Sequence, residues 1–235
     1  MYVRPAQRAV CALVIVAATL ACFPGCGGQV FGRQFEYEEE IFLSLDGSVS
    51  VVVNSSIAAM VVLRGATLDA SPDARVDRDA VRAFYGCQGA EVIRVSRPWE
   101  RAGRRFVQVR VDAPDLHALS TCRAFGWATY ALTREQGTMR YTQRIGAPAA
   151  PSGALTSQGA GWTGDELVAV RMHLPSRITF HNAPSREVER GNILTWEQPL
   201  RSRLAGEPIE IDVRMDERSI LRRTMTASRC AGVIW

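Results

Sequence analysis

The sequence predicts an α+β fold, in which an antiparallel sheet built from β-hairpins is partly covered by two or three short helices. Apolar residues recur at every second position in several paired segments, which is the period of a half-buried strand. Short turns join these pairs, and strands joined by a short turn must run antiparallel. Capping residues followed by apolar runs indicate helices between the hairpins.

The first hairpin is predicted at the start of the folded part. Its apolar positions alternate along two segments, at Phe35, Tyr37, Ile41, Leu43 and Leu45 and then at Val49, Val51 and Val53. Asp46-Gly47 between them predicts a two-residue turn. Glu36, Glu38 and Glu40 fall on the outward face, where we expect solvent to surround them. Glu39 falls on the core side, where it indicates either a strand end or a buried ion pair.

Two helices are predicted after this hairpin. The segment Asn54–Ser56 offers a helix cap before the apolar run Ile57–Leu63, and Gly65 follows where a left-handed helix end is expected. A second helix is predicted from about Asp77 to Tyr85, and Gly86 ends it.

Further hairpins follow along the chain. The pattern predicts a second hairpin from residues 92–95 and 106–111, a short helix from Pro114 through Cys122, and a third hairpin within 130–141 that turns near Gln136-Gly137. Alternation resumes in three late segments, at 168–174, 194–196 and 209–216. These late strands either extend the same sheet or form a small second β unit.

The N-terminal segment has the layout of a secretory signal peptide. Arg4 and Arg8 precede the uncharged apolar run Ala9–Leu20, which is too short to span a bilayer comfortably. A cysteine near the cleavage point is typical of a bacterial lipoprotein. Cys26 is the preferred lipidation site because a glycine precedes it and two glycines follow. Cys22 is the alternative. We therefore expect export to the bacterial cell envelope and anchoring to its membrane by lipid.

The predicted organisation follows from these segments. It comprises a signal peptide and lipidation site at 1–26, a tether at 27–34, an α+β domain at 35–145, a loop or linker at 146–164, a β-rich extension of the same domain at 165–218 and a C-terminal tail at 219–235.

Composition and charge exclude some classes of protein. The chain is 47% hydrophobic and 22% charged, which is ordinary for a globular protein and argues against disorder. Its formal charge is +4, and about half of that lies in the signal peptide, so the mature part lacks the basic stripe of a nucleic-acid-binding protein. Cys87 and Cys122 are candidates for a disulfide in an oxidising compartment. The alternative is two buried thiols.

The tip of the second hairpin is the most suggestive surface. Arginine and aromatic side chains gather there, at Arg97, Trp99, Arg101, Arg104 and Arg105. Arginine binds phosphate through two hydrogen bonds and an aromatic ring is stable at a lipid interface, so the tip is a candidate contact for anionic lipid headgroups. The alternative is an arginine-rich turn that keeps the hairpin soluble.

Motifs for catalysis or metal binding are weak. Gly159–Gly164 matches G-x-G-x-x-G, but it follows a Pro/Ala/Ser segment and precedes a predicted strand, so we expect a loop and no dinucleotide site. His117, His173 and His181 lack a second ligand at helix or strand spacing. We therefore expect no metal site, no cofactor and no catalytic residues.

The late segment carries a resemblance to a family. Leu174-Pro175-Ser176-Arg177-Ile178-Thr179-Phe180-His181-Asn182 and then Gly191-Asn192-Ile193-Leu194-Thr195-Trp196, together with the lipoprotein signal and the first hairpin, resemble the LppM-like envelope lipoproteins. The resemblance implies a domain outside the membrane that binds lipid or glycolipid in an apolar cavity, with no catalytic residues. Members commonly continue into a C-terminal membrane helix, and the arginine-rich end of this sequence departs from that pattern.

The sequence therefore predicts a non-enzymatic binding or accessory module, with a lipid or another amphiphile as the expected ligand. The residues expected to line its pocket are the helix Ile57–Leu63 and the inner-face positions Val107, Val109, Tyr130 and Leu132, which otherwise form the core. The alternative is a protein-interaction or assembly factor that uses sheet edges or the late strands.

Overall fold

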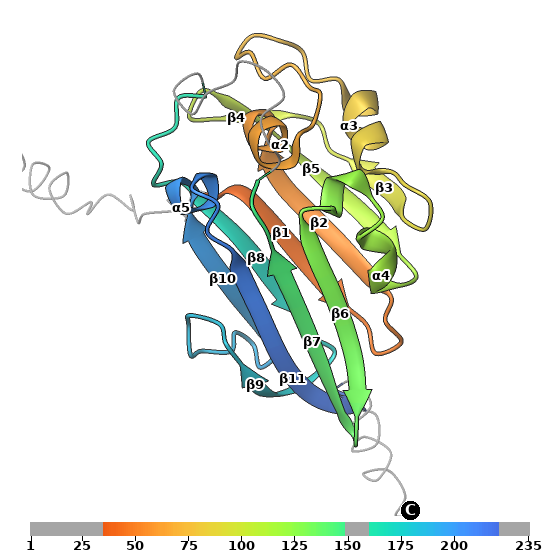
Figure 1. Cartoon of the computed structure of the whole chain (residues 1–235). Helices are drawn as coiled ribbons and strands as arrows, with labels where there is room; N and C mark the ends of the chain where they lie inside the picture. Colours follow the sequence, from red (N-terminus) through yellow and green to blue (C-terminus); the bar gives the residue numbers. More distant parts are fainter. Residues whose placement is uncertain (1–34, 149–159, 221–235) are drawn as a thin grey trace, which may run out of the picture. The chain divides into compact units, whose positions relative to one another are not determined.

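The computed structural model describes residues 35–148 and 160–220, which form two β-sheets and several short helices (Figure 1). The predicted signal peptide and tether, the lipidation candidates Cys22 and Cys26, most of the predicted loop and all but two residues of the tail lie outside the described residues. The elements in chain order are β1 (Phe35–Leu43), β2 (Val49–Ser56), α2 (Ile57–Arg64), α3 (Arg78–Tyr85), β3 (Glu91–Val95), β4 (Trp99–Arg101), β5 (Arg104–Ala113), α4 (Leu116–Leu119), η1 (Arg123–Phe125), β6 (Ala128–Glu135), β7 (Thr138–Ile145), β8 (Leu167–His173), β9 (Ser176–His181), β10 (Ile193–Pro199), α5 (Leu200–Leu204) and β11 (Ile209–Ser219).

The first sheet has the strand order β10-β8-β1-β2-β5-β3, and β4 also pairs with β5. The second sheet has the order β6-β7-β11-β9. Of the predicted late strands, β8 and β10 extend the first sheet, whereas β11 pairs with β7 of the third hairpin in the second sheet. The strand β9, which the alternation did not predict, lies at the edge of the second sheet. The fold class is α+β, as predicted, and most pairs are antiparallel. One pair departs: β1 and β8 run parallel, which the long segment of chain between them permits.

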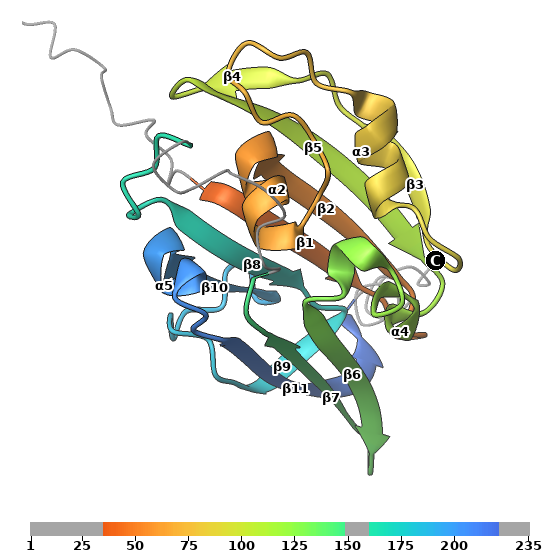
Figure 2. The same cartoon turned by 45° about the horizontal axis from the view of Figure 1, so that its top comes forward.

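The two sheets share one apolar core. Ile41 and Val109 of the first sheet belong to the same buried cluster as Tyr141 and Val213 of the second. Figure 1 shows β7 and β11 passing in front of β1 and β8, and Figure 2 shows α2 lying against β1 and β2 at one end of the core. Among the described residues, no helix combines the length and the apolar character needed to cross a membrane.

Helix α2 forms where the sequence predicts it. The Ser56 side chain accepts a hydrogen bond from the Ala59 amide at 3.0 Å, which satisfies one of the free amides at the helix start. Gly65 adopts a left-handed conformation at a φ of 67° and ends the helix. All eight residues of α2 are buried, including Arg64 at its end.

The turns are only partly as predicted. Gln136 and Gly137 both have positive φ angles, 49° and 83°, and they join β6 to β7 directly, as a two-residue hairpin turn requires. Asp46-Gly47 does not form such a turn. The loop runs from residue 44 to residue 48, and the Asp46 carboxylate accepts hydrogen bonds from the amide and hydroxyl of Ser48. Asp46 is stabilised by this local bond, which competes with the tighter turn.

We expect the cap of α3 to be worth about 1 kcal/mol of stability. The exposed Asp77 side chain accepts hydrogen bonds from the amides of Asp79 at 2.9 Å and Ala80 at 3.0 Å. Asp77→Ala removes both acceptors and should lower the free energy of unfolding by that amount in a urea titration. Asp77→Asn keeps an acceptor and is the control. Equal losses in the two variants would contradict the role of the cap.

Candidate functional site

An ion pair is buried between α2 and the first sheet. The alternation of β1 turns Glu39 toward the core, and the last turn of α2 brings Arg64 to it at 3.1 Å, with both side chains wholly inaccessible to solvent. The Tyr37 hydroxyl donates a hydrogen bond to the Glu39 carboxylate at 2.6 Å, and Arg64 donates to the Ala124 carbonyl. Of the two interpretations of Glu39, the buried ion pair is the one that the structure bears out.

A second buried arginine lies beside this pair. The guanidinium carbon of Arg64 lies 3.6 Å from the centre of the Trp127 ring, and that of Arg203, from α5, lies 5.2 Å from the same ring. The Arg203 side chain is fully buried and donates hydrogen bonds to the carbonyl groups of Gly146 and Glu207. Two guanidinium groups therefore accompany one carboxylate, which leaves a net positive charge in the interior.

In the same region, more hydrogen-bond donors than acceptors are buried without a partner. We call it the arginine centre, and it comprises Tyr37, Glu39, Arg64, Tyr85, Trp127, Tyr130, Gln143 and Arg203. Several of its buried atoms have no hydrogen-bond partner among the described residues, namely the donors Arg64 Nε and Nη1, Arg203 Nε, Trp127 Nε1 and Gln143 Nε2, the acceptor Glu39 Oε2, and the hydroxyl oxygens of Tyr85 and Tyr130. Buried polar groups are normally paired, so this group of unpaired atoms marks the arginine centre as the candidate site.

Burial sets the protonation of this centre. It raises the pKa of Tyr37, Tyr85 and Tyr130 above the usual value, so these hydroxyls stay neutral and available as donors. Burial lowers the pKa of Arg203 to about 10, and the positive charge of Arg64 acts in the same direction. Arg203 nevertheless keeps its charge at neutral pH, so the net positive charge persists.

Two of the three outward glutamates of β1 are buried, contrary to the sequence-based expectation, whereas Glu40 is partly exposed. Glu36 and Glu38 are only 1% and 9% exposed. Glu36 pairs with Arg104 at 3.1 Å, and Glu38 accepts a hydrogen bond from Asn54 at 3.3 Å. Burial also raises the pKa of Glu38. The reason is topological, because β1 lies in the middle of the first sheet and side chains of neighbouring strands cover its outer face.

The arginine-rich hairpin tip divides into bound and free side chains. Arg101 donates to the Phe35 carbonyl, and Arg105 donates to the Asp69 carbonyl at 2.9 Å. Arg104 bonds to Glu36 and, at 3.1 Å, to the Gly161 carbonyl. Arg97 and Trp99 are exposed. Three of the five predicted headgroup contacts are thus held by the protein itself, and two remain open to a partner.

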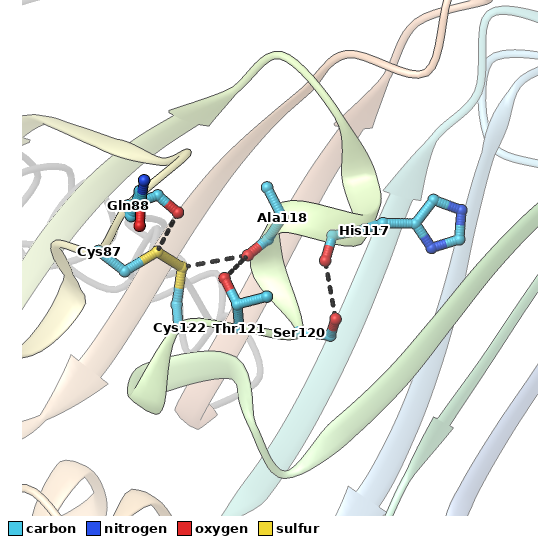
Figure 3. The surroundings of a disulfide bond; sticks show 7 residues. All are labelled: Cys87, Gln88, His117, Ala118, Ser120, Thr121 and Cys122. Atoms are coloured by element: carbon cyan, nitrogen blue, oxygen red, sulfur yellow. Dashed lines mark hydrogen bonds between the residues drawn. A yellow bond between two sulfur atoms is a disulfide. The ribbon is translucent and has the colours of Figure 1, made fainter.

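Cys87 and Cys122 are joined by a disulfide, with their Cα atoms 5.3 Å apart (Figure 3). Cys87 lies just before β3, and Cys122 lies between α4 and η1, where the predicted third helix is shorter than expected. The bond therefore links the edge of the first sheet to the segment that leads into β6. Cys230 lies outside the described residues.

The structure also shows where the glycine motif and the histidines of the sequence lie. Gly161 and Gly164 of the G-x-G-x-x-G match belong to a loop that leads into β8, and no helix follows them as a dinucleotide site requires. His173 bonds to Glu40 at 3.3 Å and stacks on Phe42. Within residues 35–148 and 160–220, no three His, Cys, Asp or Glu side chains are grouped closely enough to hold a metal ion.

The residues expected to line an apolar pocket are packed side chains of the core. Val107, Val109 and Tyr130 are buried in the cluster that both sheets share, and Leu132 is partly buried against it. All of Ile57–Leu63 is buried in α2. The arginine centre was not predicted as a site, because Arg64 and Arg203 are single arginines among many and only the inward position of Glu39 signalled it.

Comparisons with known proteins give little further information. No family model matches the chain, and no curated protein matches it. Among solved structures, its fold is similar to the NMR structure of the folded domain of LppM from Mycobacterium tuberculosis, with a TM-score of 0.41 and 16% sequence identity. The match covers 80% of this chain and 94% of that one. A likeness of this extent carries no conclusion about the family of this chain or about what it binds.

Proposed function

We propose that this chain is a lipid-anchored protein of the bacterial envelope and acts as a non-enzymatic binding module for an anionic group. The acidic headgroup of a lipid or glycolipid has this chemistry, and so does free phosphate. The signal-peptide layout with Cys26 supports the location. The observation that carries the binding role is the arginine centre, with its net positive charge and its surplus of buried donors.

The physical reason is the cost of burying charge. A guanidinium group without a counter-ion in the interior is unfavourable, and its stability increases when an anion accepts its hydrogen bonds. Arg64 already has Glu39 as a partner, whereas Arg203 has two neutral carbonyl groups. Arg203 is therefore the residue whose charge an anionic ligand would balance, and because its side chain is fully buried, the ligand can reach it only when the packing around α5 opens.

Native mass spectrometry tests this proposal. Residues 35–235 form one compact unit and would be purified without detergent, then measured before and after addition of phosphate or of lipids from the envelope. We expect an added mass with the wild-type protein and its loss in Arg203→Met. Arg201→Met is the matched control, because Arg201 lies in the same helix but is exposed and pairs with Asp165 at the surface.

The outcomes separate the ligand classes. An added mass that solvent extraction removes identifies a lipid, and one that appears with phosphate alone identifies a free anion. At a ligand concentration of 100 times Kd, binding should also stabilise the folded state by about 2.7 kcal/mol. A clean apo mass that neither addition changes would refute the binding role, provided that circular dichroism shows a folded protein.

A further inference from the structure

The hairpin formed by β4 and the start of β5 presents an aromatic side chain to solvent. We call residues Ser96–Arg105 the β4–β5 arm. Trp99 is 40% exposed, and its ring stacks on the buried Phe106 ring at 5.8 Å with an angle of 21° between the planes. The Arg101 guanidinium lies 4.2 Å from the centre of the same Phe106 ring. Trp99 is thus held in place on one side and open on the other.

The arm lies next to the start of β1. Arg101 donates to the Phe35 carbonyl, and Arg104 pairs with Glu36 at 3.1 Å. These contacts hold the arm beside the first described residue of the domain. Figure 2 shows β4 at one end of the first sheet, well away from β9.

The number of residues between Cys26 and Phe35 limits how far Phe35 can lie from a membrane that holds a lipid on Cys26. Phe35 is nine residues from Cys26, and nine extended residues span at most about 30 Å. With a lipid on Cys26, as the proposed function requires, the end of the domain that carries Phe35 and the β4–β5 arm must stay within that distance of the bilayer.

Charge on and beside the arm fits an anionic surface. Arg94 of β3 and Arg97 of the arm are exposed, and neither side chain has an ion-pair partner within the described parts of the chain. An exposed arginine near an anionic membrane is stabilised by about 1 kcal/mol, and tryptophan is stable at the depth of the headgroups. Glu100 is the exposed acid of the arm and offsets part of this charge.

The geometry points to the β4–β5 arm as the face of the domain that contacts the anionic membrane surface, with Trp99 at the interface and Arg94 and Arg97 at lipid phosphates. Arg101 and Arg104 do not reach the lipid in this arrangement. They position the arm against the start of β1, so their replacement would disturb the domain and is a poor test of membrane contact. This inference rests on the lipid anchor of the proposed function and assigns the orientation that the anchor leaves open.

Fluorescence quenching by brominated lipids tests the contact. The full chain would be reconstituted in nanodiscs that contain anionic phosphatidylglycerol with bromine on its acyl chains, and tryptophan emission compared with nanodiscs of unbrominated lipid. The chain has five tryptophans. We expect clear quenching in the wild-type protein and loss of most of it in Trp99→Phe. Arg94→Glu with Arg97→Glu should weaken the quenching, and more so at low ionic strength.

The control for charge is Arg186→Glu, since Arg186 is exposed in the segment between β9 and β10. Unchanged quenching in Trp99→Phe, or no quenching in the wild-type protein, would overturn the assignment of this face. The anchor is tested separately by the membrane fraction of cells that express Cys22→Ala with Cys26→Ala. Release of that variant into the soluble fraction supports the anchor whichever face meets the lipid.

Discussion

Arg64→Leu is expected to lower the free energy of unfolding by about 3–5 kcal/mol, because it leaves the Glu39 carboxylate buried without its counter-charge. Both side chains of the pair are wholly inaccessible to solvent, so water cannot replace the lost partner. Tyr37 still donates one hydrogen bond to Glu39, which is too little to compensate for a lost charge. The measurement is a urea titration followed by circular dichroism.

Two further variants separate the charge from the packing. Glu39→Leu with Arg64→Leu removes the pair together, and we expect it to be more stable than Arg64→Leu alone, since no unpaired charge remains. Arg144→Leu is the surface control. Arg144 and Glu210 are paired at 3.3 Å and both are 65% exposed, so the loss there should be less than about 1 kcal/mol. Equal losses in Arg64→Leu and Arg144→Leu would show that burial does not set the cost.

The local sequence pattern predicts where most strands and helices of this fold lie, but it does not predict which strands pair with each other. Alternation and turn residues locate β1, β2, β6 and β7, while Ser56 and Gly65 mark the ends of α2. The pairing of β1 with β8 joins segments more than a hundred residues apart, and no local signal encodes it. The error at Glu36 and Glu38 has this same origin, because alternation tells which way a side chain points but not what covers that face.

Most residues of the arginine centre could not be predicted from the sequence, for a related reason. Arg64 follows an apolar run, where an arginine at a helix end usually reaches solvent and stabilises the helix dipole. Only the tertiary packing of α2, which brings Arg64 against Glu39, Ala124 and Trp127, buries it. Arg203 lies in a short helix that no pattern predicted. The arginine tip shows the reverse case, since its members were found from composition and only the structure separates those that bind the protein from those that are free.

Reduction of the Cys87–Cys122 disulfide is the second change for which we expect a large loss of stability. The bond closes a loop with a sequence separation of 35 residues. In the chain-entropy model, a cross-link of this span restricts the unfolded chain by an amount equivalent to about 3–4 kcal/mol. Cys87→Ala with Cys122→Ala should lower the free energy of unfolding by that amount, measured by urea titration against the oxidised wild-type protein.

A comparison under reducing conditions tests the source of this loss. Wild-type protein in excess dithiothreitol should unfold at the same urea concentration as the double alanine variant, and the variant itself should be insensitive to dithiothreitol. The loop contains β3, β4, β5 and α4, so the bond restricts the segment that carries the β4–β5 arm. Because the bond forms only in an oxidising compartment, protein expressed without its signal peptide in a reducing cytosol should show the lower stability. Equal stability of the oxidised and reduced protein would mean that the sheets, and not the cross-link, hold this segment in place.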